Sequence, residues 1–114
     1  MDKMYRINYI VGEDNAACTI YIYPILDEKN TYFLIRSGQN NRQIKKNSIG
    51  EIKNADIDKT GFYVFLTELD NKDMYIKQMI KRVKDNAQRQ VQRFESIYDN
   101  AIECDIKIVD VEPE

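Results

Sequence analysis

The sequence contains no histidine, and this absence excludes several kinds of active site at once. Histidine is the commonest general base and the commonest metal ligand in proteins. A Ser-His-Asp triad or a Cys-His pair cannot be built without it. The chain has two cysteines, Cys18 and Cys104, and two isolated thiols do not make a zinc site of the usual kind. We therefore assign no catalytic residue, no cofactor and no metal ligand, and we expect the chain not to be an enzyme.

Glycine is scarce as well, with four residues that stand far apart in the sequence. Neither a P-loop nor a GxGxxG phosphate-binding turn can be built from such spacing. Residues 56–61 match the first positions of a calcium-binding loop, but its twelfth position is Thr67 where a bidentate glutamate is needed. We interpret this segment as an Asp-rich turn that precedes a strand.

Long apolar runs and a secretory leader are also missing. No apolar stretch approaches the ~18 residues that a membrane span requires. The N-terminal residues lack the apolar core and the small-residue cleavage site of a signal peptide. We therefore expect a cytoplasmic protein without a membrane span, in which Cys18 and Cys104 are reduced thiols rather than a disulfide.

The composition that remains is typical of one globular domain over residues 1–114, because 43% of the residues are hydrophobic and 32% are charged. Residues 1–69 indicate mainly β structure, since short segments of alternating or β-branched residues are separated by turns. The expected strands lie within residues 5–11, 18–25, 31–37 and 62–66, with short strands near 44 and 49–52. Pro24 lacks an amide donor, so we expect it at a strand end or on a sheet edge.

Residues 71–102 contain neither glycine nor proline and carry an apolar residue at every third or fourth position. This spacing predicts one long amphipathic helix over residues 70–103, with Asp70 as its N-cap. Residues 104–114 are expected to form a short closing strand or an acidic tail. The predicted fold class is therefore α+β: an antiparallel β-meander of about four to six strands, open or closed into a small barrel, followed by a long C-terminal helix.

A helix of this length predicts an oligomer. Roughly 32 helical residues span ~48 Å, whereas a compact domain of this size is ~35 Å across. A second copy of the chain is the simplest cover for the overhanging apolar stripe, and the basic middle and acidic end of the helix favour antiparallel pairing. The alternative is a helix that breaks near Asn86 and folds back as a hairpin. The expected interface residues are Ile80, Val83, Ala87, Val91, Phe94, Tyr98 and Ala101.

Charge is distributed unevenly along a chain whose net charge is −2 and whose pI is about 5.2. Residues 36–53 carry five basic side chains against one acid, whereas residues 94–114 carry one against seven. Arginine grips phosphate with two hydrogen bonds, and asparagine amides read base edges. This basic segment is our candidate ligand site, although the bland interpretation is a solvated surface. The candidate ligand-binding residues are Arg36, Asn40, Asn41, Arg42, Lys45 and Lys46.

These features favour a small non-enzymatic, oligomeric protein that acts by forming a stoichiometric complex with a protein partner or by sequestering a small anionic ligand. Residues with A/T-rich codons are common, which is compatible with a phage or mobile-element inhibitor of host defence. One alternative is an accessory protein that binds nucleic acid through this basic segment and the basic flanks of the helix. A low pI argues against general nucleic-acid binding. A structural assembly protein is the other alternative.

Overall fold

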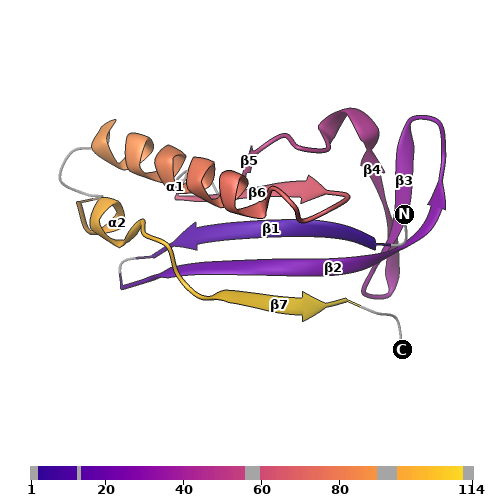
Figure 1. Cartoon of the computed structure of the whole chain (residues 1–114), viewed down its shortest axis with the longest axis horizontal. Helices are drawn as coiled ribbons and strands as arrows, with labels where there is room; N and C mark the ends of the chain where they lie inside the picture. The colour runs from indigo at the N-terminus through magenta and orange to yellow at the C-terminus, as the bar shows by residue number, and fades with distance from the viewer. Residues whose placement is uncertain (1–2, 13, 56–59, 90–94, 112–114) are drawn as a thin grey trace.

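The computed structural model describes residues 3–12, 14–55, 60–89 and 95–111 (Figure 1). The strands are β1 (Lys3–Val11), β2 (Ala16–Glu28), β3 (Tyr32–Ser37), β4 (Asn40–Lys45), β5 (Lys53–Asn54), β6 (Gly61–Leu66) and β7 (Ile106–Asp110). The helices are α1 (Lys72–Arg89), α2 (Glu95–Asn100) and the short 3₁₀ helix η1 (Lys46–Ser48). A sheet followed by a long helix confirms the predicted α+β class.

The strands form one sheet with the order β4-β3-β2-β1-β6-β5, and β7 pairs with β2 outside this path. The first four strands are sequential antiparallel neighbours, as the predicted meander requires, and β6 returns to the free edge of β1. The path ends at β4 and β5, which do not pair with each other, so the sheet is open and curled. The expected closing strand is present as β7, but it pairs parallel to β2.

Pro24 lies within the longest strand rather than at its end. The outer edge of β2 pairs with β7 from Cys18 to Ile22 and with β3 from Ile25 onward. Pro24 therefore lies between the part of this edge that pairs with β7 and the part that pairs with β3. Because proline has no amide N–H, no backbone donor is left without a partner at this position. The two halves of β2 diverge here, so β7 stays with the main sheet while the β3–β4 hairpin turns across its end (Figure 1).

The main sheet carries a different apolar cluster on each face. The larger cluster, here called the helix-side core, lies between α1, α2 and the sheet, with Ile7, Val64 and Met79 fully buried at its centre. The smaller cluster lies on the opposite face beneath the β3–β4 hairpin. It consists of Met4, Tyr23, Phe33, Ile35, Ile44 and Phe65. Successive strand residues point to opposite faces, so β1 supplies Ile7 to one core and Met4 to the other.

The predicted single helix over residues 70–103 is corrected by the structure, in which the described part of this range forms two helices. Helix α1 ends at Arg89, and α2 spans Glu95–Asn100. An 18-residue helix is ~27 Å long, which fits a molecule measuring 46 × 27 × 26 Å. The overhang that suggested an oligomer came from assuming one straight helix on a spherical domain, and neither assumption holds.

The residues assigned to an oligomer interface serve the chain's own core instead. Val83, Ala87 and Ala101 are buried in the helix-side core, and Ile80 and Tyr98 pack against it. Helix α2 covers the same core, which is why the apolar stripe continues beyond the end of α1. The other two predicted interface residues, Val91 and Phe94, lie outside the described residues.

Candidate functional site

The sheet face opposite the helices gathers arginine and aromatic side chains from four strands, β1, β2, β4 and β6. Arg6 of β1 lies in register between Tyr21 of β2 and Phe65 of β6. Residues that are directly opposite on paired strands project from the same face, so these three side chains form one row across the sheet. We call this surface the arginine–aromatic face. It comprises Arg6, Tyr21, Tyr23, Arg42, Tyr63 and Phe65.

Arg6 is held among rings rather than against a carboxylate. Its Cζ lies 4.6 Å from the ring centroid of Tyr21, 5.8 Å from that of Tyr23 and 6.0 Å from that of Phe65. Its Nε is buried and has no hydrogen-bond partner among the described residues, and the same holds for Oδ1 of Asn8 on the same strand face. Buried polar atoms normally have partners because removing them from water is costly. This part of the sheet therefore holds unused hydrogen-bonding capacity.

Arg42 reaches the same aromatic group from the hairpin. It pairs in register with Ile35, a member of the smaller core, so its side chain is on the inner surface of the hairpin. Its Cζ lies 5.3 Å from the ring centroid of Phe65. Among the described residues, no carboxylate forms an ion pair with Arg6 or Arg42. Two guanidinium groups thus flank one phenyl ring, and neither is in an ion pair with a described carboxylate.

A shallow cavity of about 260 Å³ opens beside Arg42. Tyr63 and Phe65 line it, and their rings meet edge to face with centroids 5.9 Å apart. Three cations, Arg42, Lys45 and Lys53, and one acid, Glu51, also line the cavity. The balance is positive here although the chain as a whole is negative, so the cavity is suited to an anion.

The structure divides the predicted ligand site between two surfaces of the hairpin. Ser37 to Asn40 is a tight turn between β3 and β4 rather than a long loop, and Gly38 adopts a φ of 66° that glycine tolerates best. Arg42 and Lys45 line the cavity. The alternation of β3 places Arg36 on the hairpin surface away from Ile35, and Asn41 is its register partner. Register pairs Asn40 with Ser37 on the inner surface.

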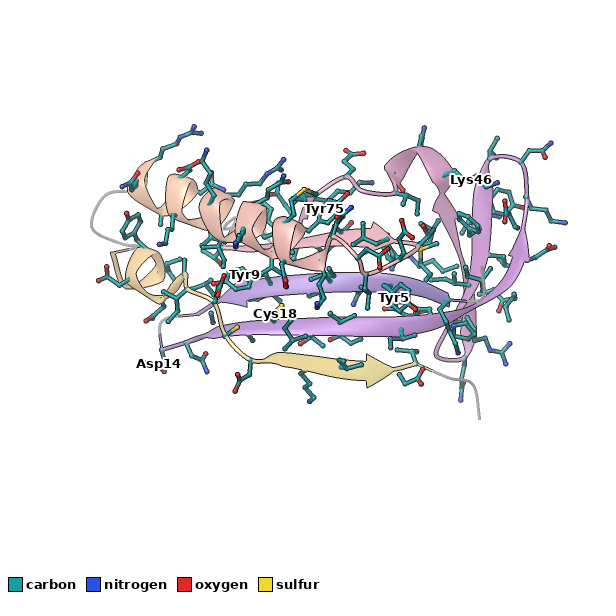
Figure 2. All side chains as sticks on the ribbon, in the orientation of Figure 1. Tyr5, Tyr9, Asp14, Cys18, Lys46 and Tyr75 are labelled. Carbon is teal, nitrogen blue, oxygen red and sulfur yellow. The ribbon has the colours of Figure 1, made fainter. Side chains whose placement is uncertain are left out.

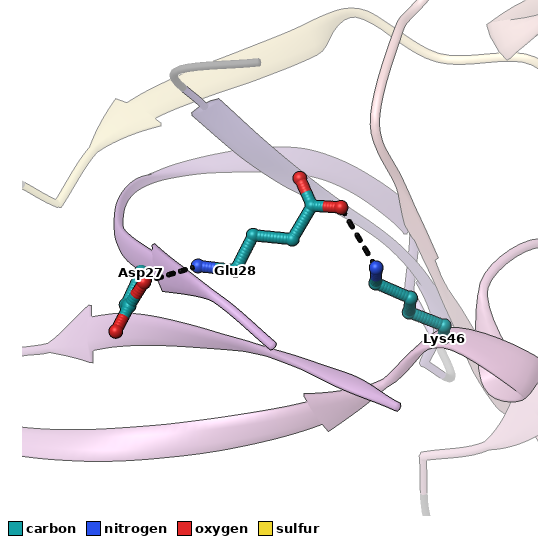
Figure 3. Close-up of polar contacts among 3 residues, drawn as sticks. All are labelled: Asp27, Glu28 and Lys46. Carbon is teal, nitrogen blue, oxygen red and sulfur yellow. Dashed lines mark hydrogen bonds and ion pairs between the residues drawn. The ribbon is translucent and has the colours of Figure 1, made fainter. Parts of the chain in front are cut away.

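Lys46 has a structural contact of its own. Its Nζ lies 2.7 Å from Oε2 of Glu28 (Figure 3). The same Nζ lies 5.1 Å from the ring centroid of Phe33. The Asp27 carboxylate accepts a hydrogen bond from the backbone N–H of Glu28 at 2.9 Å. The hydrogen bond from Lys29 is the main reason that the pKa of Asp27 lies below its usual value. Lys46 is therefore paired with the end of β2 and does not line the cavity.

The sequence pattern predicted one member of the arginine–aromatic face, Arg42, and missed the other five: Arg6, Tyr21, Tyr23, Tyr63 and Phe65. The alternation over residues 5–11 indicates only that Arg6 lies on the polar side of a half-buried strand. A usable signal was present in β2, where Ile20 to Tyr23 is apolar at four consecutive positions. A continuous apolar run in a strand indicates that both faces are covered, which predicts a second apolar surface beside Arg6.

The most perturbed ionisable groups lie on the other face, within the helix-side core (Figure 2). The hydroxyl of Tyr9 donates a hydrogen bond to the backbone carbonyl of Ile102. Burial raises the pKa of Tyr9 above its usual value, and burial raises the pKa of the Cys18 thiol to about 11. Burial likewise raises the pKa of Cys104, whose thiol is not in a disulfide. A protonated, buried thiol such as that of Cys18 is a poor nucleophile, and Cys18 packs within the helix-side core.

Metal and membrane features are limited to what the described residues show. No group of three or more His, Cys, Asp or Glu side chains in the described ranges is placed to hold a metal ion. Asp56 and Asp58 of the calcium-like segment lie outside those ranges. None of the helices in the described ranges is both long and apolar enough to cross a membrane.

Comparison of the chain with protein-family models, with curated proteins and with solved structures gave no match.

Proposed function

We propose that this chain is a non-enzymatic binding protein that holds an anionic ligand on the arginine–aromatic face. The observation that carries the proposal is the placement of Arg6 and Arg42 around the Phe65 ring with no described carboxylate paired to either. An anion between or beside these groups would supply the missing charge and hydrogen bonds.

A purely structural role explains Arg6 less well. A methionine or leucine would pack against Tyr21 and Tyr23 without burying a polar atom, and such replacements of buried charges are often neutral or stabilising. Arg36 also has a buried Nε without a partner among the described residues, so what sets Arg6 apart is its position within 6.0 Å of three ring centroids. Contact with the rings offsets part of the cost of burying the guanidinium and restricts its movement, which favours ligand binding.

Binding rather than catalysis is favoured by the chemistry of the side chains around the cavity. They are cations, aromatic rings and a single carboxylate, Glu51. The groups with the most perturbed pKa values, Tyr9 and Cys18, are buried on the opposite face of the sheet and do not line this cavity. A set of this kind provides charge and shape for recognition.

The proposal does not require a second copy of the chain. The apolar stripe that predicted an oligomer is covered by α2 and the sheet of the same chain, which removes the argument for antiparallel helix pairing. Self-association remains a measurable property, and native mass spectrometry of gently purified protein would report both the number of copies and the mass of any retained ligand.

The experiment that tests the proposal measures thermal stability with added inorganic phosphate, pyrophosphate and triphosphate. A ligand that binds only the folded state raises the melting temperature in proportion to its affinity and concentration. We expect stabilisation that increases with phosphate number and is lost in Arg42→Gln. The matched control is Arg36→Gln, on the same hairpin but on its other surface, which should keep the response. No stabilisation by any anion, or equal stabilisation of Arg42→Gln, would contradict the proposal.

A further inference from the structure

We infer that the ligand of the arginine–aromatic face is single-stranded nucleic acid, bound by stacking of its bases and by contacts to its phosphates. This inference rests on the proposed anion-binding function and adds the chemical class of the ligand. It is drawn from a second row of side chains, which crosses the sheet next to Arg6. The row is Lys53, Tyr63, Asn8, Thr19 and Lys107.

The register places this whole row on one face. Lys53 pairs with Tyr63, Tyr63 with Asn8, Asn8 with Thr19, and Thr19 with Lys107, so the five side chains share the face that carries Arg6. Both terminal lysines are exposed. Four strand spacings separate them, which is ~19 Å. This distance is too long for one phosphate group and suits an extended chain of phosphates with a cation near each end.

Aromatic rings lie between Lys53 and Lys107 across this face. Tyr63 and Tyr21 are both partly exposed on this face. They lie two strands apart, with β1 between them, which is ~10 Å. Rings on an open sheet provide stacking platforms for unpaired bases, and stacking is tolerant of sequence because every base has a π-face. The guanidinium of Arg6, whose Cζ lies 4.6 Å from the ring centroid of Tyr21, adds a further planar group beside these rings.

Glu51 distinguishes a nucleotide from a simple anion. It lines the cavity with Arg42, Lys45 and Lys53, so a plain phosphate placed at its centre meets one repelling carboxylate. A nucleotide presents donors as well as acceptors, and a carboxylate accepts hydrogen bonds from the amino groups of bases. A ligand with both a phosphate and a base edge therefore uses every charged group around the cavity.

The acidic pI does not oppose this inference, because the fold separates the charges. In β7, Lys107 pairs with Thr19 and so lies on the arginine–aromatic face, whereas Asp110 pairs with Ile22 and lies on the opposite one. The residue pattern that looked like an acidic tail thus contributes a cation to the face. A double helix is disfavoured as a ligand, because its bases are stacked and paired and cannot lie on protein rings.

The test is fluorescence anisotropy with three probes: a labelled oligodeoxycytidylate of about 12 nucleotides, whose bases carry amino groups, an abasic strand of the same charge, and deoxycytidine monophosphate as a competitor. We expect the base-bearing strand to bind the full chain at least ~10-fold more tightly than the abasic strand. The monophosphate should compete only at concentrations at least ~10-fold higher than unlabelled strand, because it lacks the spaced phosphates.

Two variants separate stacking from charge. Tyr63→Leu should lower the affinity for the base-bearing strand ~10-fold. It should leave unchanged the affinity for the abasic strand and the slope of log affinity against log salt. Lys53→Gln should weaken both strands and reduce the slope of log affinity against log salt by about 1. The matched control for Lys53→Gln is Lys81→Gln, an exposed lysine on α1 across the sheet, which should change neither quantity.

The outcomes distinguish the two proposals. Equal binding of the abasic and base-bearing strands overturns the nucleic-acid inference while the anion site stands. A monophosphate that competes as well as unlabelled strand restricts the ligand to a free nucleotide and also overturns the inference. If no strand binds while pyrophosphate still stabilises the wild type through Arg42, only this inference fails. If neither strands nor phosphates bind, the proposed function fails with it.

Discussion

The two faces of the main sheet are built from alternate residues of the same strands, yet they solve different problems. On one face, Ile7, Tyr9 and Val64 meet α1 and α2 in a closed core. On the other, Arg6, Asn8 and Tyr63 leave cations, polar atoms and half-exposed rings without a covering helix. The first face is a closed core, whereas the second combines the smaller apolar cluster with partly exposed polar and aromatic side chains. A strand with period-2 alternation can therefore present different chemistry on each of its two sides.

The largest expected effect comes from a substitution in the helix-side core. Met79 is fully buried on α1, so Met79→Ala should lower the free energy of unfolding by about 2–5 kcal/mol through lost burial and the cavity left behind. The matched control is Met74→Ala on the same helix, where the side chain is 45% exposed and the change should stay within ~0.5 kcal/mol. Urea titrations of both variants measure this, and similar values for the two would contradict the assigned core.

Alkaline pH should lower the free energy of unfolding through ionisable groups in the same helix-side core. The pKa values of Tyr9 and Cys18 are raised by burial, that of Cys18 to about 11. The folded chain therefore keeps protons that the unfolded chain has released, and stability must fall as pH rises from the unfolded pKa towards the folded one. Urea unfolding at several pH values between about 8 and about 11 should show this decline. Cys18→Ala should make the decline shallower, and an unchanged slope would exclude Cys18 as a contributor.

A substitution on the arginine–aromatic face should not destabilise the chain. Arg6→Met removes a buried Nε that has no hydrogen-bond partner among the described residues, and it keeps most of the packing against Tyr21. The free energy of unfolding should therefore change by less than ~1 kcal/mol or should rise. The same variant should lose the stabilisation by phosphates, because the guanidinium is gone. A loss of more than ~2 kcal/mol would assign Arg6 to the structural side of the comparison.

The smallest effect is expected at the hairpin edge, which belongs to neither face. Lys46 and Glu28 form an ion pair of 2.7 Å in which both side chains are substantially exposed. A double-mutant cycle with Lys46→Met and Glu28→Gln should give a coupling energy of ~0–1 kcal/mol that declines with added salt. A larger, salt-independent value would mean that this contact sets the position of η1 rather than merely accompanying it.

Local patterns in the sequence were sufficient for the elements and for the fold class. Alternation over residues 5–11 predicted β1, and the Gly61–Leu66 segment was recognised as a strand from its β-forming residues. The three- and four-residue spacing predicted helix from residue 71 onward, and α1 occupies most of it. These patterns are reliable because side-chain direction within an element depends only on its own period.

The candidate site was predictable only in part. Arg42 and Lys45 were named from the basic segment, and both line the cavity. Arg36 and Lys46, equally good candidates by composition, lie elsewhere because strand alternation and the Glu28 contact direct them away. Arg6 and Phe65 are 59 residues apart in the sequence and become neighbours only when β6 pairs with the free edge of β1.

The division between sequence and fold follows from the range of the interactions. Period, turn composition and net charge are local, so the residues alone indicated an α+β chain with a β-rich first part, a helical stripe and no histidine chemistry. Which partner buries that stripe, and which strand returns to β1, depend on contacts between distant segments. The sequence pattern predicted the apolar stripe, but it did not predict that a separate helix, α2, helps to bury it. Arg6 was visible as an alternating polar residue, but tertiary pairing decided that rings, rather than water, surround it.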